Sequence, residues 1–309
     1  MQAESTRLER VRSLELSPAG FRRLALLAAA ALYVIVVTGA VVRLTSSGLG
    51  CESWPGCEAG AFFPESDHHA FVEFGNRVFG LFPIVLTLVA WLGARRTRGL
   101  PRWVVRTALA TAAGTIAQAP LGLLTITFDL HPLLVMSHFL LALLVLAGAV
   151  VVALEAWGLD RGRAAPLVPV ELRRAGLVLA GACLALVVTG TFTTAAGPHS
   201  GGEEIRRLGQ LTDSLYVHVR ATAVFGCVFL FVLGYLAARR ARAPRLFALA
   251  LGLLGLILVQ MAVGETQWRT ELPWGVVLVH VGLAAAIWAW TVVLVTLFWR
   301  PTAGVAPGA

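Results

Sequence analysis

The sequence predicts an all-α polytopic membrane protein, with eight transmembrane helices arranged as two tandem, pseudo-symmetric four-helix bundles and both termini in the cytoplasm. Three observations predict this class: the composition, the number of long apolar runs and an internal repeat. The 309 residues are 58% hydrophobic and 14% charged, with a mean hydropathy of +0.79. Soluble domains carry about a quarter charged residues, so this chain has more apolar surface than a soluble core can bury.

Eight apolar runs are long enough to cross a bilayer, which needs roughly 20 such residues. Polar Gln118 and Gln260 interrupt the third and the seventh run. No small-residue cleavage site follows the first run, so we expect it to be a span and not a signal peptide. The runs cover residues 24–43, 77–94, 104–126, 133–154, 175–195, 216–238, 246–264 and 275–299.

Arginine placement predicts the orientation of the spans. The net charge is +8 and all 25 basic residues are arginines, but they form short clusters between apolar runs, which is not the pattern of a nucleic-acid surface. Nineteen of them precede the first run or follow an even-numbered one, so these segments are expected in the cytoplasm. The predicted divisions are a cytoplasmic tail 1–23, an N-terminal half 24–154, a cytoplasmic linker 155–174, a C-terminal half 175–299 and a tail 300–309.

An internal repeat relates the two halves. The motif VVTG at residues 36–39 recurs 151 residues later, at 187–190. Polar or special positions further along the first half recur 142 residues later. The two offsets, 151 and 142, differ by nine, so the first outer loop carries nine extra residues. Repeats in one orientation are common in membrane proteins. The pairs are Asn76 and His218, Gln118 and Gln260, Gly122 and Gly264, and His138 and His280.

The enlarged outer loop contains two of the four cysteines. Cys51 and Cys57 have five residues between them on the oxidising side of the membrane, where a disulfide can form and persist. Two free thiols or a metal site are the alternatives, and spacing does not decide whether a disulfide is structural or redox-active. Cys183 and Cys227 fall inside apolar runs and are expected to be small buried hydrophobic residues.

Three histidines are expected at one depth in the membrane. His138, His218 and His280 lie near the outer ends of the fourth, sixth and eighth spans, and facing helices of a bundle hold cofactors between their side chains. We expect His218 and His280 to ligate one metal centre. Two facing imidazoles suit a six-coordinate haem better than tetrahedral zinc. The alternative is a hydrogen-bonded contact between helices.

Arg43, Arg77 and Arg220 lie at the outer ends of spans. Arg77 is next to Asn76, and Arg220 is two residues after His218. We expect their guanidinium groups to contact haem propionates. The alternative is that they extend to the phosphates of membrane lipids.

Five segments together resemble haem A synthase: TGAVVRLTSSGLGCESWPGC, VEFGNR, VMSHF, LYVHVR and LVHVG. The resemblance covers essentially all eight spans. It implies an eight-helix membrane enzyme that oxidises the C8 methyl group of haem O to the formyl group of haem A, for the assembly of haem-copper cytochrome oxidase. It also implies a haem b cofactor between His218 and His280 in the C-terminal half, and the substrate haem in the N-terminal half.

The sequence departs from the family pattern at Asn76, where family members commonly have a histidine. Asparagine is a poor iron ligand, so the substrate iron is expected to have His138 on one side. The other side is expected to hold Asn76, water or one of three loop histidines, which are His68, His69 and His131.

Glu73 matches the functional carboxylate of the family. The resemblance implies that Glu73 is catalytic, as a proton acceptor or as a group that stabilises positive charge while the methyl group is oxidised. The alternative is an acid at a helix start that interacts favourably with the helix dipole.

Two successive oxidations release electrons, for which the haem b is the expected relay and a quinone or another molecule the acceptor. Haem O synthase and oxidase assembly factors are expected partners, and the location is a bacterial plasma membrane with the cysteine loop on the outer face. Two other functions stay open. A dihaem, quinol-linked electron-transfer protein would not convert haem O, and a haem permease would explain the spans but neither the cysteine loop nor the matched histidines.

Overall fold

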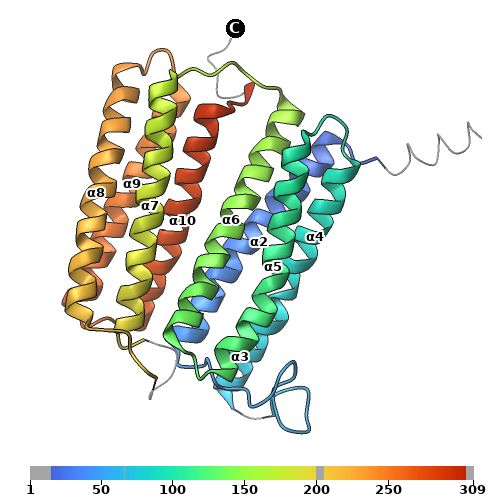
Figure 1. Cartoon of the computed structure of the whole chain (residues 1–309), viewed down its shortest axis with the longest axis vertical. Coiled ribbons are helices and arrows are strands. Elements are labelled where there is room, and N and C mark those ends of the chain that lie inside the picture. Colours follow the sequence, from blue (N-terminus) through green and yellow to red (C-terminus); the bar gives the residue numbers. More distant parts are fainter. Residues whose placement is uncertain (1–14, 66, 200–204, 304–309) are drawn as a thin grey trace, which may run out of the picture.

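The computed structural model describes residues 15–65, 67–199 and 205–303, and its regular elements in these ranges are helices (Figure 1). Eight stretches of the described chain are long and apolar enough to cross a membrane. The all-α membrane class is therefore confirmed. The helices are α2 (Pro18–Leu44), α3 (His68–Phe79), α4 (Leu81–Arg96), α5 (Arg102–Thr127), α6 (Pro132–Arg161), α7 (Val170–Ala196), α8 (Leu211–Ala238), α9 (Pro244–Arg269) and α10 (Trp274–Trp299).

The second stretch consists of two helices, α3 and α4, which meet at Gly80. The Asp67 side chain caps α3 by accepting a hydrogen bond from the backbone N–H of His69 at 3.3 Å, as short polar side chains do at helix starts. The helix begins nine residues before the apolar run 77–94, because its first turns carry histidines and a carboxylate that a hydropathy criterion excludes. Glu73 therefore lies near a helix start.

Two connections share an uncommon backbone conformation. Asp129 and Leu130 join α5 to α6 with φ of 48° and 54°, and Glu271 and Leu272 join α9 to α10 with φ of 62° each. Positive φ is sterically unfavourable for residues other than glycine. In both connections the leucine donates its N–H to a carbonyl five residues earlier, at 2.7 Å. The two turns are therefore alike in conformation, and they are separated by the 142-residue offset of the sequence repeat.

The helices contact one another in two rings. In the first, α2 and α5 each contact α4 and α6; in the second, α7 and α9 each contact α8 and α10. The rings meet where α10 contacts α2 and α6 and where α6 contacts α7 (Figure 1). The division of the chain into halves 24–154 and 175–299, with its pseudo-symmetry, stays a prediction that this packing order accommodates.

Polar side chains tie the rings together inside an apolar core. The indole N–H of Trp288 on α10 donates to the carbonyl of Leu143 on α6 at 2.8 Å. The hydroxyl of Tyr33 on α2 donates to the carbonyl of Gly282 on α10 at 3.1 Å. No water satisfies such groups in a bilayer core, so these bonds favour one relative position of the helices.

The C-terminal ends of α6 and α10 lie at the end of the bundle away from α3 (Figure 1), and Glu155 near the end of α6 carries a buried carboxylate. The predicted fourth span ends at residue 154, but α6 continues to Arg161 and includes Glu155, whose side chain is 0% exposed. Glu155 forms ion pairs with Arg163, just after α6, and with Arg300, just after α10, the latter at 2.5 Å. A buried charge requires such partners, and the two arginines supply them.

Candidate functional site

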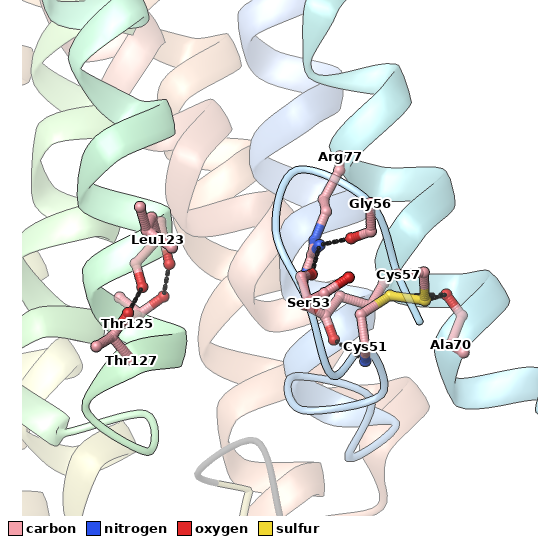
Figure 2. Close-up of polar contacts among 11 residues, drawn as sticks. Cys51, Ser53, Gly56, Cys57, Ala70, Arg77, Leu123, Thr125 and Thr127 are labelled. Atoms are coloured by element: carbon pink, nitrogen blue, oxygen red, sulfur yellow. Dashed lines mark hydrogen bonds and ion pairs between the residues drawn. A yellow bond between two sulfur atoms is a disulfide. The ribbon is translucent and has the colours of Figure 1, made fainter. Parts of the chain in front are cut away.

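Cys51 and Cys57 form a disulfide bond, as the sequence predicts (Figure 2). Both cysteines are buried, and they pack with Ala70 and Phe74 of α3. The loop that they close therefore lies against α3, and its fold does not depend on the bilayer alone.

Glu73 and Arg77 hold this loop in place from α3. The carboxylate of Glu73 is buried; Oε2 accepts a hydrogen bond from the backbone N–H of Cys51 at 2.9 Å, and Oε1 accepts one from Nη2 of Arg77 at 2.5 Å. Nη1 of Arg77 donates to the carbonyls of Ser53 at 2.7 Å and Gly56 at 2.6 Å (Figure 2). Charge-assisted hydrogen bonds are the stronger ones in proteins. The structure thus gives both residues an anchoring task that the sequence did not indicate.

His218 on α8 and His280 on α10 face each other, with ring centroids 6.4 Å apart and an angle of 65° between the rings. A metal–imidazole bond is about 2 Å long, so two imidazoles on opposite sides of one metal have centroids roughly 6 Å apart once the half-width of each ring is added. The observed separation therefore fits two axial ligands of one iron. Gly190 on α7 makes this possible, since a Cβ there would lie 3.0 Å from Cε1 of His218.

Thr189 orients one of these two rings. Its Oγ1 donates to the carbonyl of Leu186 at 2.8 Å and lies 3.2 Å from Nδ1 of His218. Because its own proton is used, the hydroxyl oxygen accepts a hydrogen bond from Nδ1–H, which leaves the Nε2 lone pair free to bind a metal. Metal-ligating histidines commonly have their other ring nitrogen fixed in this way.

The first group of helices, formed by α2, α4, α5 and α6, repeats only part of this arrangement. Cε1 of His138 on α6 lies 3.4 Å from where a Cβ of Gly122 would be, and Cε1 of His280 lies 3.3 Å from where a Cβ of Gly264 would be. Opposite His138, however, the repeat places Asn76 of α3, whose Oδ1 is buried without a hydrogen-bond partner in the described chain. This half therefore presents one imidazole and one unpaired carboxamide.

The loop histidines have other neighbours. His69 lies with Nδ1 2.9 Å from the hydroxyl of Ser47, and His68 is exposed and 3.7 Å from the Asp67 carboxylate. His131 is the N-cap residue of α6 and forms no side-chain capping hydrogen bond. None of these contacts is with His138, and a loop histidine as a ligand of the substrate iron stays a prediction.

The remaining predicted arginines are Arg43, at the end of α2, and Arg220, in the third turn of α8. Arg43 is half-buried in the last turn of α2. Arg220 is exposed on α8, with Cζ 3.2 Å from the ring centroid of Tyr216 one turn earlier. No described residue pairs with either guanidinium through an ion pair, so both are available to an anionic group. Of the three, only Arg77 forms an ion pair within the described chain.

The two cysteines in spans differ. Cys183 on α7 is buried as expected, but Cys227 on α8 is exposed, so the expectation of burial is wrong for Cys227. An apolar run indicates that water is excluded but does not distinguish a protein neighbour from a lipid. Cys227 is exposed on a helix that is long and apolar enough to cross a membrane.

The donor set can be compared in chemistry with a haem, the group that the resemblance implies. Within the described residues, no three His, Cys, Asp or Glu side chains cluster as a metal site, so the histidines form a pair. A pair of imidazoles in an apolar core suits an iron whose other four ligands come from a porphyrin. The residues present fit a haem.

The fold and the site define an all-helical membrane protein with paired histidines in its apolar core. Residues 22–292 match the family model described as cytochrome oxidase assembly protein, COX15-CtaA, and the chain belongs to this family. A relative from Shewanella oneidensis named heme A synthase is 26% identical over 313 residues, which cover 86% of this chain and 93% of the relative. Relatives of the same name from Bacillus pumilus and Symbiobacterium thermophilum are 27% and 32% identical, over 49% and 42% of this chain and 50% and 43% of their own lengths. The resemblance drawn from the sequence is confirmed.

Proposed function

We propose that this chain is a haem A synthase, which oxidises the C8 methyl group of haem O to a formyl group and so makes haem A for cytochrome oxidase. One structural observation carries the proposal. His218 and His280 face each other at a separation that fits two axial ligands, whereas in the other half the repeat position of His218 holds Asn76. One half is thus equipped to retain a haem, and the other to accept a haem that leaves again.

The retained group is a haem b in the half formed by residues 175–299. Nε2 of His218 and Nε2 of His280 would bind its iron. Thr189 keeps the proton of the His218 ring on Nδ1, which leaves Nε2 free for the iron. A haem bound there supplies one-electron transfer. Arg220, at the same end of α8, is the proposed propionate contact.

The substrate haem O binds in the half formed by residues 24–154. His138 supplies one strong iron ligand, and Asn76 or water takes the opposite side, since an amide oxygen is a weak ligand. A substrate held by one imidazole dissociates more readily than one held by two. Arg43 at the end of α2 is the proposed propionate contact in this half.

Glu73 is the proposed catalytic carboxylate. It lies one turn before Asn76 on α3, so both side chains point to the same side of the helix. Oxidation of a methyl group draws electron density from its carbon, and a fixed carboxylate stabilises that positive charge. The two donors to Glu73, the N–H of Cys51 and Arg77, hold the carboxylate in place for this task.

The site lies at the outer face of a bacterial plasma membrane in this proposal, in keeping with the arginine distribution. Each conversion releases electrons, so a quinone or another acceptor takes part, and haem O synthase supplies the substrate. We further propose that the Cys51–Cys57 disulfide holds the loop over the substrate half.

The decisive experiment supplies haem O to membranes that contain wild-type protein or the Glu73→Ala variant, with haem A measured by chromatography. Wild-type protein should produce haem A, and the variant should lose most of this activity while retaining its bound haem. Folded, haem-loaded wild-type protein that produces no haem A would refute the enzymatic function and favour a dihaem electron-transfer protein.

A further inference from the structure

Two glutamines interrupt the third and seventh apolar runs, and the structure shows what they contact. Nε2 of Gln118 on α5 donates to the backbone carbonyl of His138 on α6 at 3.2 Å. Nε2 of Gln260 on α9 donates to the backbone carbonyl of His280 on α10 at 3.1 Å. The same two atoms are therefore hydrogen-bonded in each half, and the offset of 142 residues relates one bond to the other. In each bond the accepting carbonyl belongs to a histidine that is proposed to bind iron.

Each of these pairs leaves two buried polar atoms unpaired within the described chain. They are Oε1 of the glutamine and Nδ1 of the histidine, again in both halves. The amide oxygen only accepts hydrogen bonds, and Nδ1 donates when Nε2 uses its lone pair to bind a metal. Buried polar atoms are rarely left unpaired, so each half holds one matching acceptor and donor.

The histidine rings are oriented toward the helices that carry the glutamines. A Cβ on Gly122 of α5 would lie 4.0 Å from Nδ1 of His138, and a Cβ on Gly264 of α9 would lie 3.6 Å from Nδ1 of His280. Each glycine lies one turn after the glutamine of its helix and on the same face. The Cε1–Nδ1 edge of each ring, with Cε1 nearest, is therefore directed at the helix that presents the unpaired Oε1.

We propose that Gln118 and Gln260 are positioning residues of the iron-ligating histidines. Each glutamine holds the histidine backbone through Nε2 and accepts a hydrogen bond from the histidine Nδ1–H through Oε1 when Nε2 binds iron. A change in side-chain torsions brings the two unpaired atoms together. His218 needs no such partner, because Thr189 already accepts from its Nδ1. This inference rests on the proposed function insofar as that function places iron at His138 and His280.

The competing role is a simple tie between helices, since glutamine commonly makes such bonds in membrane proteins. The two roles predict different electronic properties of a bound haem. An acceptor on Nδ1–H increases the basicity of the imidazole and favours ferric iron, which lowers the midpoint potential. A tie between helices affects haem occupancy but leaves the potential of the bound fraction unchanged.

The test measures the midpoint potential of the haem b in purified protein by optical redox titration. Gln260→Leu should raise the potential, and Gln260→Glu, whose carboxylate is a stronger acceptor than the amide oxygen, should lower it below the wild-type value. Gln267→Leu is the matched control, because Gln267 lies on the same helix, also has a buried unpaired Oε1, and makes no bond to a histidine carbonyl. It should leave the potential at the wild-type value.

Gln118→Leu should decrease kcat for haem O and leave the potential of the haem b unchanged, since His138 belongs to the substrate half. Wild-type potentials in both Gln260 variants would overturn the inference. If Gln260→Leu fails to bind haem, the Gln260→Glu protein decides: a wild-type potential there also overturns it. A shifted potential without conversion of haem O would contradict the proposed function alone, and a wild-type protein that binds no haem would contradict both.

Discussion

The carboxylate of Glu73 accepts a hydrogen bond from the backbone N–H of Cys51, 22 residues earlier in the chain, at 2.9 Å. The same carboxylate pairs with Arg77, which binds two carbonyls of the loop closed by the disulfide. A group proposed to act on the substrate is therefore also the group on which the loop rests. The proposed catalysis and the position of the loop therefore both depend on the Glu73 side chain.

We expect Glu73→Ala to weaken the loop as well as to remove activity. Breaking a buried ion pair costs about 3–5 kcal/mol because the remaining charge is left without a partner. The Cys51–Cys57 disulfide should therefore be reduced faster by an added thiol, which thiol alkylation followed by mass spectrometry would measure.

The control for this change is Glu265→Ala. Glu265 and Arg269 have the same spacing and the same 2.5 Å separation as Glu73 and Arg77, but they are exposed, and exposed pairs contribute about 0.3–0.5 kcal/mol. Glu265→Ala should leave the reduction rate unchanged. Equal rates in wild type and Glu73→Ala would show that the carboxylate does not support the loop.

Thr189→Val should weaken haem binding in the C-terminal half. The change keeps the shape of the side chain and removes the oxygen that accepts from Nδ1–H of His218, and loss of such a partner typically costs 10–100-fold in metal affinity. A haem titration of the apoprotein measures this. Thr38→Val is the control, because Thr38 occupies the same place in the repeated VVTG motif and bonds only to the Ile35 carbonyl. Equal losses in both variants would argue against a role specific to His218.

His280→Ala should remove the optical spectrum of the haem b, whereas His138→Ala should retain it and lose most turnover. The reason is the different pairing of the two residues: His280 faces a second imidazole, and His138 does not. Visible spectra of purified protein and haem A chromatography distinguish these outcomes. Equal loss of bound haem in the two variants would contradict the separate assignments.

Asn76→His should convert the substrate half into a site with two imidazoles. The repeat partner of Asn76 is His218, and Gly39 of the VVTG motif leaves open space where its partner Gly190 meets the His218 ring. We expect a low-spin, six-coordinate spectrum for bound haem O and slower release of product, so that kcat falls while haem binding becomes tighter. An unchanged spectrum would place Asn76 away from the iron.

The sequence predicted the parts of this structure that depend on hydropathy and on spacing. Eight spans, the disulfide and the family follow from patterns along the chain. The task of Arg77 could not be predicted in this way, because its acceptors are backbone carbonyls of Ser53 and Gly56, which no residue type identifies. The exposure of Cys227 was missed for a related reason, since a hydrophobic run does not specify its neighbours.

Two further residue roles had a signal in the sequence that went unused. The repeated VVTG motif contains Thr189, and among the four residues of the motif only the threonine has a side chain that can form a hydrogen bond with the His218 ring. Gln118 and Gln260 shared the repeat offset with the histidines, but an offset does not reveal that their side chains reach across to the neighbouring helix. Their contacts require the helix packing to be known.

The Glu155 carboxylate has a consequence for the order in which the protein is made. Arg300, one of its two partners, is synthesised 145 residues later, and residues beside it bond back to the linker, with Ala164 N–H to the Pro301 carbonyl at 3.1 Å and Ala303 N–H to the Gly162 carbonyl at 2.8 Å. Until α10 has entered the membrane, Glu155 therefore lacks one of its cations. An unfinished or truncated chain carries an incompletely neutralised charge, a feature by which quality-control proteases could distinguish it from the finished protein.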